Sequence, residues 1–310
     1  MYGDVLFVIN DDPIIIGKLL NEGFKFMCYS NSVISSPKIL RKVSPDRIII
    51  DIPFGSKELL RLIRNVIGGR SKIIILGDSS FNIPEKAEEF CDVIVDFNLS
   101  SAVFQNEKFY DPITKTLFLK GPKYIPIRDE FLFCARDLLG INNVRKITLI
   151  FGGSDPRNLT TRSLKLIDEF YNSNHIIWID VIIGPKFTNV EELKRVSESI
   201  NKPIKLTIHR DIPNVADFVC HADLVLTSPG MSMLEALAAS TPTAAFIQNN
   251  IQRKVYSHWK IVYELEDMPR IISSIFSGEY LSFFAKYFEN VVRKMEIGLG
   301  KYDVIRAVVE

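Results

Sequence analysis

The sequence has 310 residues, of which 47% are hydrophobic, and it carries 38 lysines and arginines against 37 aspartates and glutamates. This length accommodates two domains of ordinary size, each with its own hydrophobic core. The formal net charge of +1 argues against a global field that would attract nucleic acid or an anionic membrane. An anionic ligand must therefore be bound by local groups.

The start of the chain, the lengths of its apolar runs and the spacing of its cysteines together predict a cytoplasmic protein. Residues 1–12 place acids on both sides of a short apolar run, unlike the basic start of a signal peptide. The most apolar runs, such as residues 175–184, have about half the length that spans a bilayer. The four cysteines (Cys28, Cys91, Cys134 and Cys220) contain no CxxC pair, which argues against a zinc knuckle or a disulfide framework. We therefore expect free thiols, no membrane span, no metal and no cofactor.

The first half of the chain alternates between strand and helix patterns. Strands are expected at residues 5–9, 24–28, 47–51, 72–76 and 92–96, with a helix at residues 56–66. Residues 97–123 read as an irregular segment before a helix at residues 129–139. The pattern predicts a Rossmann-like domain over residues 1–143.

The second half alternates more strictly, which is typical of βαβ units that build a parallel sheet. Five strands are expected at residues 146–151, 177–183, 204–208, 223–227 and 243–247, with helices between them. This predicts a doubly wound domain over residues 144–310. The residues from 271 onward have helical spacing, and we expect this tail to pack back across the hinge.

Two turns in the second half are candidate anion sites. Gly152-Gly153-Ser154 lies between a predicted strand and a helix, and Ser228-Pro229-Gly230-Met231-Ser232 precedes another helix. Glycines let a phosphate approach the backbone, and free N–H groups at a helix start bind anions. Both turns follow strands, so both open at the carboxyl edge of the sheet, where doubly wound folds bind ligands. Taken singly, each turn is equally well explained as a plain connection.

Few side chains suggest catalysis. Glu235, about one turn into its helix, is placed to accept hydrogen bonds from ribose hydroxyls, or it is an ordinary acid near a helix start. All four histidines lie between residues 175 and 258, and no Ser/His/Asp or HExxH pattern is present. Asp51, which ends an apolar strand, is the best-placed carboxylate for a base, and it is equally suited to capping the next turn.

Several motifs together resemble a known family. They are residues 121–131 (GPKYIPIRDEF), 151–160 (FGGSDPRNLT), 183–185, 222–235, 242–252, and Gly300-Lys301 with Arg306. In these motifs the chain resembles the UDP-sugar hydrolases of pseudaminic acid biosynthesis, which are relatives of the N-acetylglucosaminyltransferase that makes the lipid-linked peptidoglycan precursor. The resemblance covers nearly the whole chain. It implies a GT-B-like α/β fold, with two Rossmann-like domains facing a central cleft, that binds UDP or a UDP-sugar in surface-glycan or nonulosonic acid biosynthesis.

The resemblance also implies roles for individual residues. The implied contacts are Gly152, Gly153 and Ser154 at the diphosphate and sugar, backbone near Ile212 at uracil, Gly230, Met231 and Ser232 at phosphate, Glu235 at ribose, and Gln252 near the sugar. The chain departs from the family at Ile251 and Pro229, where the family has asparagine and glycine, and these changes leave the sugar unidentified.

The start of the chain differs most from the family. Members open with a strand and a glycine loop whose histidine is implied to activate water, whereas Met1 here begins at the family's second strand. Asp51 is then the remaining candidate base on the acceptor or water side. Three readings follow: a UDP-sugar hydrolase or glycosyltransferase, a binding protein that has lost catalysis and acts as a partner or regulator, and one part of a split enzyme whose partner supplies the missing loop.

Overall fold

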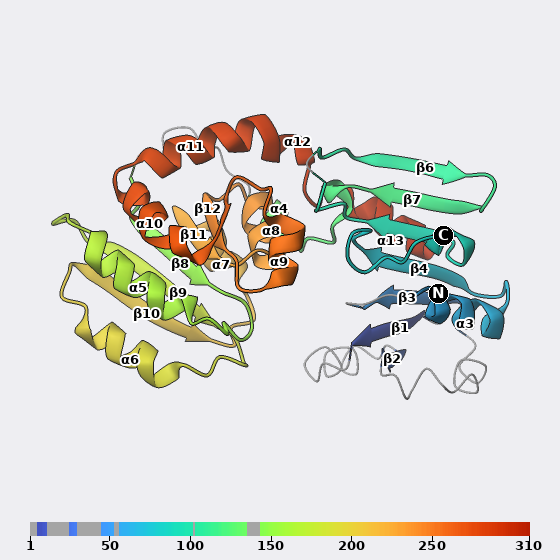
Figure 1. Ribbon diagram of the computed structural model, residues 1–310, viewed down its shortest axis with the longest axis horizontal. Coiled ribbons are helices and arrows are strands. Elements are labelled where there is room, and N and C mark those ends of the chain that lie inside the picture. Colours follow the sequence, from blue (N-terminus) through green and yellow to red (C-terminus); the bar gives the residue numbers. More distant parts are fainter. Residues whose placement is uncertain (1–4, 11–24, 30–44, 53–55, 102, 135–142) are drawn as a thin grey trace. The chain divides into compact units, whose positions relative to one another are not determined.

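The computed structural model describes residues 5–10, 25–29, 45–52, 56–101, 103–134 and 143–310 (Figure 1). The chain forms two compact units. Unit 1 comprises Met1–Pro126 and Gly298–Glu310, and unit 2 comprises Ile127–Ile297. The division therefore falls before the 143/144 boundary expected from the sequence, and the last helix joins unit 1. Within the part of the chain that is described, no helix is long and apolar enough to cross a membrane.

Unit 1 is built on a seven-stranded sheet of order β2-β1-β3-β4-β5-β7-β6. All neighbouring strands are parallel except β6 and β7, which form an antiparallel hairpin. The strands are β1 (Val5–Asn10), β2 (Lys25–Tyr29), β3 (Arg47–Asp51), β4 (Lys72–Gly77), β5 (Val93–Asp96), β6 (Glu107–Asp111) and β7 (Thr116–Lys120). The hairpin corrects the expectation of an irregular segment over residues 97–123. Its first strand is mostly exposed and lacks the apolar alternation that marks a half-buried strand.

The core of unit 1 lies on both faces of the sheet. Strands β3 and β4 are nearly continuous runs of isoleucine, as parallel strands covered on both faces require. Helix α3 (Lys57–Ile67) begins at Ser56, whose hydroxyl accepts a hydrogen bond from the Leu59 N–H, and it packs on one face. Helix α13 (Lys301–Val309) packs on the other face. The described part of unit 1 also contains two 3₁₀ turns, η1 (Ala87–Glu89) and η2 (Pro122–Tyr124).

Unit 1 holds the end of α13 through two cations on neighbouring strands. Arg47 of β3 donates to the Val309 carbonyl, and the Lys72 ammonium of β4 donates to the Ala307 carbonyl at 2.7 Å. The last carbonyls of a helix have no partner within the helix, and cations there also interact favourably with its dipole. The last helix is therefore an integral part of unit 1, whereas residues 271–297 belong to unit 2.

Unit 2 is a six-stranded parallel sheet of order β10-β9-β8-β11-β12-β13. Its strands are β8 (Lys146–Ile150), β9 (Ile177–Ile183), β10 (Ile204–Arg210), β11 (Leu224–Thr227), β12 (Thr243–Phe246) and β13 (Val262–Tyr263). The five strands expected from the sequence are present. Strand β13 has only two residues, too few for a periodic pattern.

The helices of unit 2 cover both faces of this sheet. They are α4 (Asp129–Leu132), α5 (Leu159–Phe170), α6 (Val190–Ser199), α7 (Ala216–Cys220), α8 (Met231–Ala238), α9 (Asn250–Tyr256), α10 (Met268–Phe276), α11 (Glu279–Tyr287) and α12 (Arg293–Met295), with η3 (Leu265–Asp267) and the π-helical η4 (Phe288–Val292). The chain moves outward from β8 to β10 and then crosses to β11. Because parallel crossovers are right-handed, α5 and α6 lie on one face and α8 on the other.

A disulfide joins Cys134, just after α4, to Cys220 at the end of α7. It corrects the expectation that these two cysteines are free thiols, whereas Cys91 is free and buried. The two cysteines are 86 residues apart in the sequence. Because α4 packs against α7, only the tertiary structure brings them together.

Candidate functional site

The two candidate turns lie side by side at the centre of the unit 2 sheet. Strands β8 and β11 are neighbours, with Ile150 opposite Thr227, and the Thr227 hydroxyl donates to the Ile150 carbonyl at 2.7 Å. The first turn follows β8 and the second follows β11. The order 3-2-1-4-5-6 of this sheet reverses at this pair of strands, and ligands of doubly wound sheets bind at such a reversal.

The glycine turn after β8 is held in place on one side by neighbouring backbone and is open on the other side. Gly152 has φ +80°, which favours glycine, and a Cβ added to Gly152 or Gly153 would meet nothing within 4 Å. From behind, Gly184 packs so closely that a Cβ there would lie 2.5 Å from the Gly153 Cα. The Lys186 N–H also donates to the Gly153 carbonyl at 3.0 Å. The turn therefore presents bare backbone to an open space.

The start of α5 is already occupied by a carboxylate. Asp155 is 2% exposed, and its oxygens accept hydrogen bonds from the N–H groups of Leu159 and Thr160, both at 2.8 Å. Asp155 and Asn158 both adopt positive φ, at 42° and 53°. The expectation that this helix offers its N–H groups to a phosphate is therefore wrong for α5. What the turn offers is its own backbone.

The start of α8 is open. Gly230 precedes it with φ 147°, and no side chain caps the helix. The first bond of the helix runs from the Leu234 N–H to the Gly230 carbonyl at 3.1 Å, so the N–H groups of the first turn have no partner within the helix. Met231 is 47% exposed, and Ser232 is partly buried. This helix start, rather than that of α5, can bind an anion.

Glu235 lies one turn into α8 and is paired with an arginine. It is 8% exposed, and the Arg128 Nε donates to its Oε1 at 3.0 Å. Arg128 immediately precedes α4, stacks on Phe131 at 4.7 Å, and also contacts Glu130 at 3.2 Å. Burial raises the pKa of the Glu235 carboxyl, and the Arg128 interaction opposes this rise. Sequence reasoning missed the pairing, since nothing local links positions 107 residues apart.

Two glutamines tie the turns together. The Gln252 amide accepts from the Gln248 N–H and donates to the Pro229 carbonyl, both at 2.8 Å. Gln248, which sequence reasoning missed, is buried and donates to the Phe151 carbonyl at 3.1 Å and to the Ser228 hydroxyl at 2.5 Å. Gln252 therefore positions the turn before α8 with its side-chain amide.

Ile212 lies in the loop that follows β10, at the same carboxyl edge of the sheet. Its side chain is partly buried, and the preceding Asp211 has φ 50°. The loop leads directly into α7, which packs against α4. Unit 2 thus brings the predicted residues Gly152, Gly153, Ser154, Ile212, Gly230, Met231, Ser232, Glu235 and Gln252 to one edge of one sheet.

Comparison with known proteins assigns the fold. No family model matches the chain. It is 29% identical over 310 residues to Uncharacterized protein MJ1062 of Methanocaldococcus jannaschii. The alignment covers 98% of this chain but only 59% of the length of that relative. It is similar to the crystal structure of MurG from Acinetobacter baumannii, with a TM-score of 0.62, 11% identity, and coverage of 98% of this chain and 99% of that one. The chain has the GT-B fold.

Other GT-B structures agree. A glycosyltransferase from Rickettsia africae matches with a TM-score of 0.56 and 11% identity over 97% of this chain and 89% of that one. HepE from Anabaena, solved with UDP and glucose, matches with a TM-score of 0.52 and 10% identity over 98% of each chain. Units 1 and 2 are thus the two Rossmann-like domains of a GT-B fold.

Asp51 belongs to the first GT-B domain. It is the last residue of β3 and lies opposite Ile9 of β1, at the point where the order of the unit 1 sheet reverses. Its side chain is exposed to solvent. The carboxyl end of this strand pair is a ligand position in doubly wound sheets.

Two histidines of unit 2, His209 and His221, have structural partners. His209 lies within β10, and its Nε2 is 2.7 Å from the Asp180 Oδ1, while its ring packs on Phe218. The His221 Nδ1 lies 2.7 Å from the Asp217 carbonyl of its own helix. Across the described residues, no cluster of three or more His, Cys, Asp or Glu side chains is arranged to hold a metal.

Proposed function

We propose that the C-terminal GT-B domain binds UDP or a UDP-sugar at the carboxyl edge of β8 and β11. The observation that carries this proposal is the uncapped start of α8 beside a glycine turn, with open space before Gly152, Gly153 and Gly230. Backbone N–H groups and the positive end of a helix suit a diphosphate. HepE, which shares the fold, was solved with UDP and glucose.

The remaining contacts follow from this placement. With the diphosphate at α8, the Glu235 carboxylate is one turn away and accepts hydrogen bonds from the ribose hydroxyls. Backbone near Ile212 meets the uracil. Gln252 orders the Pro229 turn and borders the sugar, which is adjacent to Ser154. No cofactor or metal is needed for these contacts.

Within nucleotide-sugar chemistry, we place the protein in surface-glycan or nonulosonic acid biosynthesis, as a hydrolase-like or glycosyltransferase-like protein. Asp51 is the candidate base, because its solvent-exposed carboxylate lies at the strand reversal, which is a ligand position of such sheets. The alternatives are a binding protein without turnover, acting as a partner or regulator, and one part of a split enzyme.

Calorimetry with UDP tests the binding proposal. We expect saturable binding of UDP that is retained by UDP-sugars and lost with uridine, which lacks the diphosphate. Absence of heat with UDP at millimolar concentration, from a protein that unfolds cooperatively, would reject the nucleotide site.

A further inference from the structure

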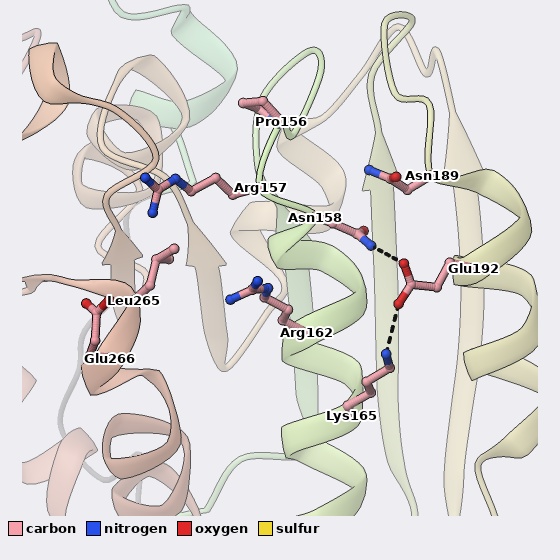
Figure 2. Close-up of a pocket in the computed structure, with 9 residues that line it drawn as sticks. All are labelled: Pro156, Arg157, Asn158, Arg162, Lys165, Asn189, Glu192, Leu265 and Glu266. Carbon is pink, nitrogen blue, oxygen red and sulfur yellow. Dashed lines mark hydrogen bonds and ion pairs between the residues drawn. The ribbon is translucent and has the colours of Figure 1, made fainter.

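A polar cavity lies along α5, beside the glycine turn (Figure 2). Its volume is about 840 Å³, and its walls come from residues 156–158, α5, the start of α6, and η3. Small-molecule sites typically have volumes of about 300–1,000 Å³. The lining is dominated by charged and amide side chains, so its ligand must be polar.

This cavity differs from the proposed nucleotide site. It is lined by α5 and α6 residues, which lie on one face of the sheet, whereas α8 lies on the other. None of the residues assigned to UDP lines it. The two sites share only the turn that leads from Gly152 to Asn158.

On one wall of the cavity, the charged side chains are paired with each other. The Glu192 carboxylate accepts from the Lys165 ammonium at 2.8 Å through Oε1 and from the Asn158 amide at 2.7 Å through Oε2 (Figure 2). These hydrogen bonds, led by that of Lys165, lower the pKa of Glu192 and keep it charged. Lys165 and Glu192 therefore neutralise each other.

The carboxylate of Glu264, which lies near Arg157, is already paired with another arginine. Arg157 lies near enough to lower the pKa of Glu264, but both oxygens of Glu264 are bonded to Arg253, at 2.6 and 2.7 Å. The Arg157 backbone N–H is held by the buried Gln248 at 3.3 Å, which fixes the base of its side chain. Its guanidinium group is left directed toward the cavity (Figure 2).

Arg162 completes the pair. It extends from α5 toward the same space as Arg157, facing Leu265 and Glu266 (Figure 2). Neither guanidinium group forms a hydrogen bond or ion pair with another described side chain. Arg157, Arg162 and Lys165 oppose two lining carboxylates, Glu192 and Glu266, which leaves an excess of one positive charge.

We propose that this cavity is a second anion site, which binds the phosphate or carboxylate group of a small polar molecule between Arg157 and Arg162. Guanidinium groups bind such oxyanions through two parallel hydrogen bonds. The site operates alongside the nucleotide site and takes a different ligand. The carboxylate of Glu266, across the cavity, repels any further negative charge on the bound molecule.

The test is a titration with inorganic phosphate, and in parallel with glucuronate, on protein saturated with UDP. UDP fills the α8 start, so any remaining phosphate binding reports on another site. We expect binding in at least one titration that weakens with added salt and weakens at least about tenfold in Arg162→Gln, the loss of about 1.4 kcal/mol. Preference for phosphate over glucuronate, or the reverse, identifies the group that the natural ligand carries.

Matched variants make the outcome specific. Arg61→Gln removes an exposed arginine of α3 in unit 1 and should leave the phosphate and glucuronate affinities unchanged. Glu266→Gln should tighten binding, because it removes the opposing charge. UDP affinity should be the same in all three variants. Equal anion affinities in Arg162→Gln and Arg61→Gln, loss of phosphate binding whenever UDP is present, or no binding of either anion would overturn the proposal.

Discussion

The Arg128 Nε lies 3.0 Å from the Glu235 Oε1 and joins the segment before α4 to the buried carboxylate of α8. The arginine favours the charged form of this carboxylate, whereas burial, the larger effect, raises its pKa. The charged form is the one that accepts hydrogen bonds from two hydroxyl groups. Under the proposed function, the pair would therefore set the charge of the group that accepts the ribose hydroxyls.

Removing Arg128 should change the pH dependence of UDP binding. Because the pKa of Glu235 is already raised, UDP affinity should fall as pH decreases through that pKa. In Arg128→Gln the pKa should rise further, and the midpoint of this loss should move to higher pH. Calorimetry across a pH series measures the midpoint. Arg293→Gln, which removes an arginine paired with Glu289 one turn earlier in the chain, is the control. An unchanged midpoint in Arg128→Gln would contradict the role of the pair.

Glu235→Ala should weaken UDP binding by roughly 1–3 kcal/mol, the cost of losing hydrogen bonds to a charged group. Affinity for UDP, measured by calorimetry at constant pH and salt, gives the result. Glu279→Ala removes a carboxylate near the start of a different helix, α11, and should have no effect. If both variants bind UDP like the parent protein, Glu235 is only a helix acid.

Gly153→Asp should abolish UDP binding and leave the fold intact. A side chain at this position meets open space, so the substitution introduces a carboxylate beside the diphosphate without a steric clash. Gly69 in unit 1 is an equally open position, and Gly69→Asp is the matched control. Circular dichroism checks the fold of both variants. Retained UDP affinity in Gly153→Asp would exclude the glycine turn from the site.

We expect the protein to bind UDP well but to hydrolyse UDP-sugars slowly. Positioned acid–base groups contribute about 10²–10⁴ in rate, and the first 174 residues contain no histidine to share this role with Asp51. We expect slow release of UDP and free sugar from UDP-linked amino and deoxy sugars, and none in Asp51→Asn, with unchanged UDP affinity. Rapid turnover that survives in Asp51→Asn would exclude Asp51 as the base.

Reducing the Cys134–Cys220 disulfide should destabilise unit 2. It closes a long loop between α4 and α7, and such links typically contribute about 2–4 kcal/mol. Cys220→Ser should lower the melting temperature in the absence of reductant. Cys91→Ser, which removes the free thiol of unit 1, serves as the comparison, and its melting temperature should not respond to reductant. A parent protein whose melting temperature is insensitive to reductant would argue against the link.

The sequence by itself determined the alternating strands of both halves and the two turns at the carboxyl edge. Strand and helix periodicity and glycine turns are local properties, so they are visible in short windows of residues. They placed Gly152, Gly230 and Glu235 after the correct strands. The order of the sheet then put both turns at the reversal between β8 and β11.

Only the tertiary structure decided which groups meet. The Arg128–Glu235 pair, the Cys134–Cys220 link, and the cavity between α5 and η3 all join segments that are distant in the sequence. Even the short-range cap of α5 by Asp155 depended on the exact start of the helix at Leu159. Periodicity fixes the face of an element, but the partner of each side chain depends on how the elements pack.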